Sequence, residues 1–431
     1  MRKNIRSSSS PKALAASFPM PPLADAMDAV RLSVDRFCLL AGVEALAEMM
    51  EEDATTVCGA RHRRHGDRRG YRWGRTQSEI GYHGGKVKVS RPRVRDRAGK
   101  EVSLESWQVL RDGDLLLEGA LNLMVLNVST RKYHRAVRLP EGDLAKAGGD
   151  GTSKSAVSRR FVALSRKKMK AWLASDLSEL DLLVIQIDGL HVGDHVLVAA
   201  IGVDGNGDKH VLAVVEGATE NTAVVQAVLD NLLARGLDPT QPRLFIVDGA
   251  KALSKAIRNT FGVAAAIQRC QVHKGRNIIE RLPQHLHASV KKVLRQAWDQ
   301  DDADQAERLL RNLARRLEHE EPGVSGSILE GLDEILTVIR LGLPHELRRS
   351  LACTNIIENA LGTVRQVTRN VKRWRHAEMA LRWTATGLLE AQKTFRRLKA
   401  YRQLPVLRNA LQEHLRKAQA DSAIETIMKA A

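Results

Sequence analysis

The chain has 431 residues, a formal net charge of +18 and four cysteines. This length accommodates two or three domains with buried cores. The charge indicates a polyanionic partner, whereas the few, widely spaced cysteines argue against a disulfide framework. The N-terminus lacks the apolar core of a signal peptide, and no stretch approaches the roughly 20 apolar residues of a membrane span. We therefore expect a soluble, cytoplasmic protein that makes no membrane contact.

The positive charge is concentrated in two segments. Residues 61–100 contain 14 Lys and Arg against three acidic residues, and residues 365–402 contain 11 against two. The rest of the chain is therefore close to neutral. Two local basic surfaces favour contact with a phosphate backbone over a uniform solubilising charge.

The N-terminal 112 residues fall into three segments of different composition. Residues 1–22 are rich in Ser, Ala and Pro, which is typical of a disordered tail. Helical periodicity predicts a helical segment over 23–57. Residues 58–112 turn to Arg and Gly with interleaved Tyr and Trp, and the alternation from Lys86 to Val94 predicts a strand. We interpret 58–112 as a small basic module that contains β structure.

Helical periodicity returns over 113–178. A polar turn after Gly151 leads into a helix start that is rich in Ser, Lys and Arg. In a helix-turn-helix domain such a helix would enter the major groove of DNA. An ordinary capped surface helix explains the same pattern. The candidate DNA contacts of this segment are Ser155, Ser158, Arg159 and Arg160.

From residue 179 the pattern becomes α/β. A tight turn at 204–208 joins two apolar runs and predicts a hairpin. Three meandering strands followed by a βαβ unit give the strand order of the ribonuclease H-like fold, and we expect 179–273 to form the first part of such a core. The predicted strands are 182–188, 195–203, 210–215, 243–247 and 264–269, and the predicted helices are 221–234 and 251–261.

Helical periodicity in the next segment predicts an all-helical insertion over 274–350. Its predicted helices are 288–298, 304–317 and 328–339, with a break at 318–323. Residues 351–405 are expected to return to the core with a helix and a basic face, and 406–431 to form a C-terminal helix or tail.

Three acidic residues occupy informative places in this pattern. Asp188 and Asp248 each end an apolar run and precede a glycine, and Glu358 lies 110 positions after Asp248. Buried carboxylates are costly unless compensated, and a divalent cation is a common compensator. The alternatives are bends at the two Asp-Gly pairs, a helix cap at Asp248, and a capping box in which Asn355 is the N-cap of the helix that carries Glu358.

Two Cys and His clusters have the spacing of partial zinc sites. Cys270 and His273 form half of such a site, and Cys58 lies near His62 and His65, but neither cluster has an evident complete ligand set. His273 could instead lie beside the metal site and contact DNA.

Further candidate DNA contacts follow from charge and aromatic placement. Trp298 could stack on a base, although the sequence favours packing in a helical core. A run of cations recurs at three- and four-residue steps and is expected to continue the helix of Glu358 along one face. The cationic candidates are Lys274, Arg276, Arg365, Arg369 and Arg373.

Together these motifs resemble the Mutator-type bacterial insertion-sequence transposases, over roughly residues 55–405. The resemblance implies a multidomain α/β plus α protein, with a ribonuclease H-like catalytic core interrupted by the all-helical insertion and an N-terminal helical and basic DNA-binding region. It also implies that Asp188, Asp248 and Glu358 hold two Mg²⁺ (or Mn²⁺) ions. The matching motifs are Ile187–Gly189, Val247–Lys251, Arg269–Lys274, Thr354–Asn359 and Val364–Arg369.

The resemblance implies a DNA transposase that binds the terminal inverted repeats of its element. It would cleave double-stranded DNA and transfer strands to target DNA, as a homodimer or larger assembly associated with the bacterial nucleoid. Two rivals remain at this point: a ribonuclease H-like nuclease or resolvase without strand transfer, and a catalytically silent DNA-binding regulator.

Overall fold

The computed structural model describes six ranges of the chain and divides it into two compact units. Unit 1 comprises residues 1–119 and 134–153, and unit 2 comprises 120–133 and 154–431. Among the described residues, no helix is long and apolar enough to cross a membrane. The described ranges are 23–63, 66–82, 85–112, 121–129, 154–217 and 222–430.

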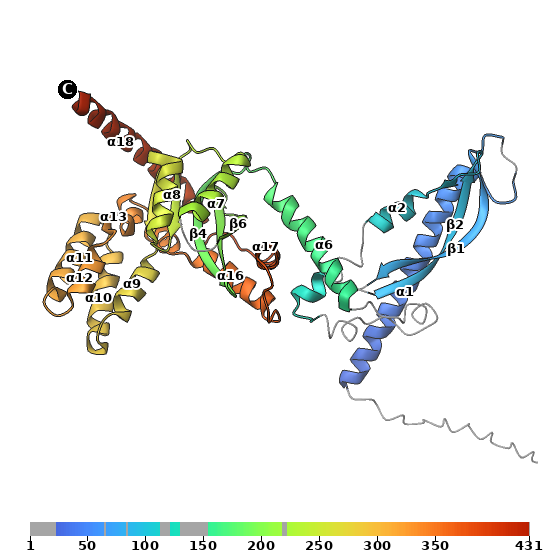
Figure 1. Cartoon of the computed structure of the whole chain (residues 1–431), viewed down its shortest axis with the longest axis horizontal. Helices are drawn as coiled ribbons and strands as arrows, with labels where there is room; N and C mark the ends of the chain where they lie inside the picture. Colours follow the sequence, from blue (N-terminus) through green and yellow to red (C-terminus); the bar gives the residue numbers. More distant parts are fainter. Residues whose placement is uncertain are drawn as a thin grey trace, which may run out of the picture. The chain divides into compact units, whose positions relative to one another are not determined.

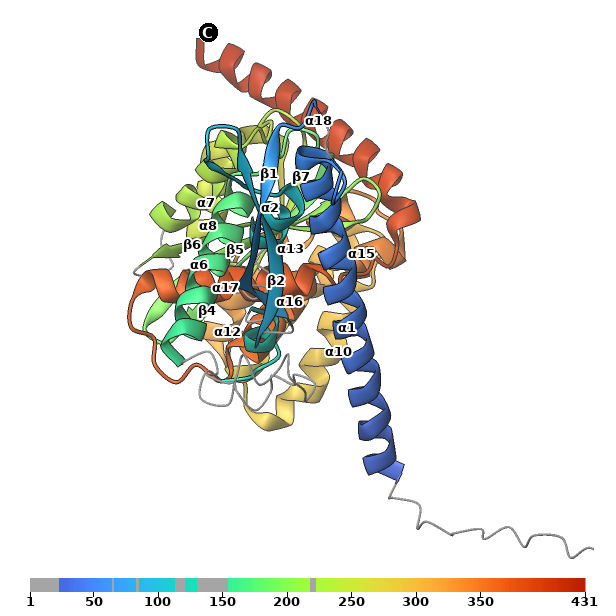
Figure 2. The same cartoon turned by 90° about the vertical axis from the view of Figure 1, so that its right-hand side faces the viewer.

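Unit 1 is an antiparallel three-stranded sheet packed against one long helix. The strand order is β1-β2-β3, and α1 contacts both long strands (Figure 2). Apolar side chains such as Met50 and Val89 form its small core. The predicted helix and strand of this part are thus present, whereas the predicted tail at 1–22 lies outside the described residues. The elements are α1 (Leu23–Cys58), β1 (Gly70–Tyr82), β2 (Gly85–Asp96), β3 (Glu101–Val102) and α2 (Glu105–Asp112).

Unit 2 contains a mixed five-stranded sheet in the order β6-β5-β4-β7-β8. The first three strands form an antiparallel meander, and β7 and β8 run parallel to β4. All five strands predicted from the sequence are present, and the first continues four residues further than expected. The strands are β4 (Leu182–Val192), β5 (His195–Asp204), β6 (Lys209–Gly217), β7 (Arg243–Val247) and β8 (Ala265–Arg269).

Helices cover both faces of this sheet (Figure 1). On one face, α7 and α8 pack on alternate strand residues such as Ile185, Ile187 and Phe245. On the other face, α16 and α17 pack on residues such as Leu197 and Ile201. The helix α6 packs against α17. These helices are α6 (Lys154–Leu173), α7 (Thr222–Ala234), α8 (Lys251–Phe261), α16 (Asn355–Thr368) and α17 (Ala377–Gln392).

The predicted insertion is helical, but its last predicted helix is wrong. The expected helix over 328–339 is broken at Gly331, whose φ of +71° is left-handed and ends helical geometry. The helices form a bundle beside the sheet (Figure 1). They are α9 (Gln271–Glu280), α10 (His287–Trp298), α11 (Ala303–Leu317), α12 (Pro322–Leu329), α13 (Leu332–Ile335), α14 (Thr337–Arg340) and α15 (His345–Leu351).

The chain after Glu358 also differs from expectation. The helix α16 ends at Thr368, so Arg369 and Arg373 lie in the following non-helical segment and do not continue its face. This segment places Trp374 against the β4–β5 turn, where a Cβ on Gly193 would lie 2.7 Å from the indole. The segment after Thr368 thus packs on the core through an aromatic side chain and does not extend the helix. The last helix, α18 (Leu404–Ala430), leads away from the sheet to the C-terminus (Figure 2).

Candidate active site

Asp188 and Asp248 lie side by side because of the strand register. In the parallel pair of β4 and β7, Ile187 is opposite Val247, and the next residue on each strand is an aspartate. Each carboxylate accepts a local backbone hydrogen bond of 2.9 Å, Asp188 from the N–H of Gly189 and Asp248 from that of residue 250. The strand alternation that buries Ile187 toward α7 and α8 turns the aspartates toward the opposite face.

Burial and neighbouring negative charge both act on Asp188. Burial raises the pKa of its carboxyl, the charge of Asp248 raises it further, and Glu358 adds to the effect. The hydrogen bond from Gly189 and the nearby His273 oppose this shift, but the pKa still reaches about 6. The three acidic residues and His273 therefore share one electrostatic environment. Burial and the neighbouring carboxylates together outweigh the opposing effects of His273 and the Gly189 N–H on the pKa of Asp188.

Glu358 lies in the first turn of α16. Its Oε1 accepts a 2.6 Å hydrogen bond from the Thr354 hydroxyl, and its backbone N–H donates to the carbonyl of Thr354. The N-cap position is Thr354, with no side-chain capping bond, so the capping box with Asn355 as N-cap is wrong. The Glu358 side chain is 33% exposed. It is thus held at one oxygen and accessible to a ligand.

Cys270 and His273 lie directly beside Glu358. Cys270 is the N-cap of α9, and its buried Sγ accepts from the backbone N–H of His273 at 3.5 Å. The Thr354 hydroxyl lies 3.4 Å from both Cys270 Sγ and His273 Nδ1. The remaining ring nitrogen of His273, Nε2, is 3.8 Å from Glu358 Oε1. One polar cluster therefore joins the start of α9 to the start of α16.

The Cys270 and His273 side chains shift each other's pKa. A hydrogen bond with Cys270 raises the pKa of His273 to about 9, although burial acts in the opposite direction. Burial alone would raise the pKa of the Cys270 thiol, but hydrogen bonds with His273 and Thr354 outweigh it and lower that pKa. His273 therefore carries the positive charge that faces Glu358 and Asp188.

Gln186 is a positioning residue that the sequence patterns missed. It is fully buried on β4, two residues before Asp188, so it projects from the same face. Its Nε2 donates to the carbonyl of Cys353, and its Oε1 accepts from the N–H of Ile357, both at 3.1 Å. These bonds fix the start of α16 against the strand that carries Asp188. A polar residue inside the apolar run 182–187 was the available signal.

Arg269 and Lys274 link the turn after Asp248 to the insertion. A Cβ at Gly249, where φ is +109°, would collide with the Arg269 guanidinium. Lys274 is buried, and its Nζ donates to the carbonyl of Glu330 at 3.0 Å. This placement does not favour the predicted contact of Lys274 with DNA. Arg276, on the same helix, is exposed.

The other candidate contacts differ in accessibility. On α6, Ser155, Ser158 and Arg159 are exposed and Arg160 is partly buried. Much of the predicted helix-turn-helix lies outside the described residues, because 113–120 and 130–153 are not described.

Three arginines after Glu358 are accessible to a negatively charged ligand. Arg365, Arg369 and Arg373 are exposed, and no ion pair joins them to a carboxylate within the described ranges. Trp298 is partly buried against α9, where a Cβ on Gly275 would lie 2.7 Å from its ring. This contact favours a packing role for Trp298 over base stacking.

The arginines of unit 1 are partly neutralised within the sheet. Glu51 pairs with Arg72 at 2.6 Å, and Glu101 pairs with Arg93 at 2.7 Å. Cys58 is buried and unpaired with another cysteine, whereas His65, the third member of its predicted zinc cluster, lies outside the described residues.

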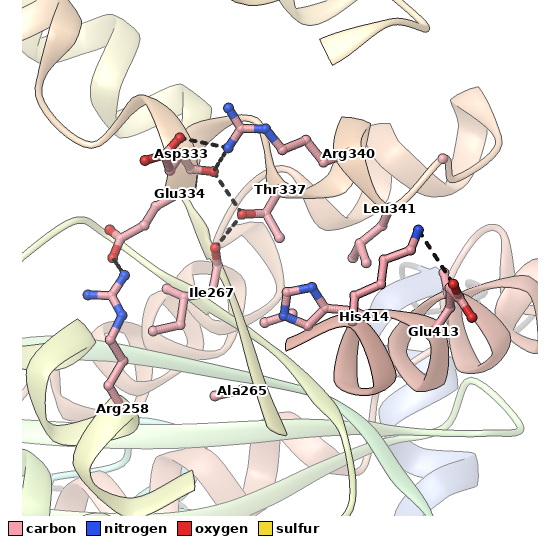
Figure 3. Close-up of a pocket in the computed structure, with 14 residues that line it drawn as sticks. Arg258, Ala265, Ile267, Asp333, Glu334, Thr337, Arg340, Leu341, Glu413 and His414 are labelled. Carbon is pink, nitrogen blue, oxygen red and sulfur yellow. Dashed lines mark hydrogen bonds and ion pairs between the residues drawn. The ribbon is translucent and has the colours of Figure 1, made fainter. Parts of the chain in front are cut away.

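A separate cavity of about 470 Å³ lies beside β8, α13, α14 and α18 (Figure 3). Its charged groups are already paired: Arg340 with Asp333 at 2.9 Å, and Lys417 with Glu413 at 3.5 Å. It flanks the beginning of β8, whereas Asp188 lies within β4 and Asp248 directly follows β7. The cavity is therefore not a candidate for the chemistry of the carboxylates.

Known proteins resemble this chain over most of its length. The family described as "Transposase, Mutator family" matches residues 30–397. The transposase for insertion sequence element ISRM5 of Rhizobium meliloti (strain 1021) is 25% identical, over 86% of this chain and 92% of the relative. The transposase for element IS256 in transposon Tn4001 of Staphylococcus aureus is 27% identical, over 74% and 80%. That for element IS6120 of Mycolicibacterium smegmatis is 29% identical, over 52% and 69%. The chain belongs to the Mutator family of transposases.

Proposed function

We propose that this transposase cleaves DNA at the ends of its insertion sequence and transfers the strands to a target through Asp188, Asp248 and Glu358. The register that sets Asp188 beside Asp248, with Glu358 in the same electrostatic environment, carries the proposal. Three antiparallel strands followed by two parallel strands, with acidic residues on β4, after β7 and on a late helix, support a ribonuclease H-like core.

The three acidic residues fit a hard divalent cation. All three offer carboxylate oxygens, the ligands that Mg²⁺ and Mn²⁺ prefer. Burial raises the pKa of Asp188 most, and the charges of Asp248 and Glu358 raise it further, so a bound cation would favour its ionised form. When bound, two Mg²⁺ (or Mn²⁺) ions supply Lewis-acid stabilisation of the charge that develops at the phosphate.

The chain's own residues orient this arrangement. Thr354 holds one oxygen of Glu358, and Gln186 fixes the start of α16, so the third carboxylate approaches the other two in a defined direction. His273, cationic at neutral pH, faces the same space and can donate a hydrogen bond to a phosphate oxygen. Water would hydrolyse the phosphodiester at the element's end. The released 3′-OH would then attack a target phosphodiester and displace the 3′-oxygen of the target strand, which leaves as a 3′-OH. No protein nucleophile is required.

The proposed partners are the terminal inverted repeats and the target DNA, both double-stranded. Exposed cations at Arg276, Arg365, Arg369 and Arg373 are available for phosphate contacts. The exposed face of α6, with Arg159, is a further candidate. Because two element ends must be joined in one reaction, we propose a homodimer or larger assembly on DNA.

The proposal is tested on supercoiled plasmid that carries the element's own ends, with and without Mg²⁺. Wild type is compared with Glu358→Gln and with Glu413→Gln, a matched acid-to-amide change on the exposed side of α18. We expect nicking and joining at the ends by wild type and Glu413→Gln, and none by Glu358→Gln.

Other outcomes redirect the assignment. Wild-type rates in Glu358→Gln contradict the role of this acid. Binding to the ends without cleavage by any of the three proteins favours a regulator, and cleavage that ignores the ends favours a nuclease.

A further inference from the structure

The side chains of Cys270, His273 and Glu358 form a compact ligand cluster. Among the described residues, this group of Cys, His, Asp or Glu has ligand atoms that all lie within 4.8 Å of one another. The sequence shows only half a zinc site, Cys-x-x-His, because Glu358 follows His273 by 85 positions. The fold supplies the third ligand by bringing the start of α16 to the start of α9.

Backbone bonds hold these ligands in place. The N–H of Cys270 donates to the carbonyl of Val247 at 2.7 Å, and that of Gln271 donates to Ala352 at 2.9 Å. The beginning of α9 is thereby attached both to the end of β7 and to the segment just before α16. One helical turn then places His273 above Cys270. The cluster is built by the same bonds that assemble the carboxylate site.

The chemistry of this donor set differs from that of the three acidic residues. A thiolate, an imidazole and a carboxylate suit Zn²⁺ and related thiophilic ions, whereas Mg²⁺ is held by oxygen alone. Tetrahedral zinc bonds of about 2.0–2.3 Å leave ligand atoms roughly 3.3–3.8 Å apart, which small side-chain rotations reach from the present geometry. Three protein ligands also leave a fourth position open for water.

We propose that Cys270, His273 and Glu358 bind one thiophilic divalent cation of the Zn²⁺ class, and that this site shares Glu358 with the proposed Mg²⁺ site. Ligation of this cation draws the Glu358 carboxylate toward Cys270 and His273, so the two sites compete for one side chain. Filling the thiophilic site therefore withdraws Glu358 from DNA chemistry and inhibits the enzyme. Cation binding stands on the cluster alone, whereas the inhibition rests on the proposed function.

Binding is measured on the full-length, metal-free protein without DNA. Cd²⁺ is titrated as the probe, and the charge-transfer absorption of the Cd²⁺–thiolate bond is followed; Zn²⁺ affinity is then obtained by competition. Cys353 is the matched control, because it is also buried and near Cys270 but lies outside the cluster. We expect one equivalent per chain in wild type and in Cys353→Ser, and no absorption band in Cys270→Ser.

A second variant separates ligand loss from misfolding. His273→Ala keeps the buried thiol and replaces a side chain that is partly exposed, so we expect the variant to fold. Its metal affinity can then be measured on the folded protein. We expect it to weaken Cd²⁺ and Zn²⁺ affinity more than about tenfold. An unchanged affinity in His273→Ala, a band that persists in Cys270→Ser, or a band lost in Cys353→Ser would overturn the site.

The shared ligand gives the second test. Zn²⁺ at concentrations that fill the site should abolish Mg²⁺-dependent cleavage by wild type, and a zinc chelator should restore it. Cleavage that continues with the site filled would overturn the sharing of Glu358. A protein that binds Cd²⁺ but never cleaves retains the site and rejects the proposed function, whereas one that cleaves but shows no Cd²⁺ band rejects the site.

Discussion

Replacing Asp188 by asparagine should stabilise the metal-free protein while it removes activity. The carboxylate of Asp188 is partly buried beside Asp248, and these surroundings raise its pKa from 3.8 to about 6. A raised pKa means that the folded protein holds the proton more tightly than the unfolded chain. Stability therefore falls as the pH rises from about 4 to about 6, and the whole cost remains at higher pH. Asparagine keeps the acceptor for the Gly189 N–H but carries no charge.

The size of the effect follows from the shift in pKa. Each pKa unit corresponds to about 1.36 kcal/mol, so a rise of about two units gives an upper bound of about 3 kcal/mol. Solvent screening at this partly exposed carboxylate reduces the expected gain in free energy of unfolding to about 1–2 kcal/mol. For a unit of this size, the gain corresponds to a rise in Tm of about 2–6 °C.

The assay is thermal unfolding in EDTA from pH 4 to pH 8, with Asp194→Asn as a control. Asp194 is exposed in the β4–β5 turn, close in sequence to Asp188. The advantage of Asp188→Asn should be complete above pH 6 and should disappear toward pH 4. Mg²⁺ should stabilise wild type and Asp194→Asn but not Asp188→Asn. An Asp188→Asn protein less stable than wild type at pH 7.5, or an advantage independent of pH, would refute the reasoning.

Two further changes test the positioning of α16. Gln186→Leu leaves two buried backbone groups without partners, so it should lower the free energy of unfolding by about 2 kcal/mol or more, measured in urea, and should reduce cleavage. Gly387→Ala places a Cβ 2.9 Å from the α16 backbone and should destabilise by about 1–3 kcal/mol, whereas Gly362→Ala meets nothing within 4 Å and should stabilise by about 0.5–1 kcal/mol. Equal Tm values for the two glycine variants, or full stability of Gln186→Leu, would contradict this packing.

The sheet could be predicted because its signals are local. Each strand is an apolar run bounded by turn residues, and the position of a residue along the run fixes the face from which it projects. The sequence therefore placed Asp248 correctly just after a strand, whereas it placed Asp188 at the end of a strand that continues to Val192. Their adjacency required one more fact, the parallel register of β4 and β7.

The rest of the site depends on partners distant in sequence. Gln186 forms hydrogen bonds with backbone groups of Cys353 and Ile357, which are 167 and 171 positions away in the sequence. Hydrophobic periodicity cannot predict contacts between residues so far apart. The cations after Thr368 are compatible with a longer helix, so the sequence did not report that α16 ends there or that Trp374 packs on the β4–β5 turn. The capping-box interpretation used Asn355 and gave Thr354 no role, and only the structure shows that the Thr354 hydroxyl meets Cys270 and Glu358.

The helical insertion is structurally part of the candidate active site. It leaves the sheet at α9 and returns just before α16, and the bond from Gln271 N–H to Ala352 ties these two ends together. Buried Gln268 of β8 forms hydrogen bonds with two backbone groups of the insertion, the carbonyl of Ile335 and the N–H of Val338. These bonds attach the insertion to the sheet edge. These bonds span about 70 positions or more, so the place of α16 beside β4 depends on how the insertion packs against β8. The completed carboxylate site, and the metal affinity proposed for it, are therefore properties of the core and insertion together.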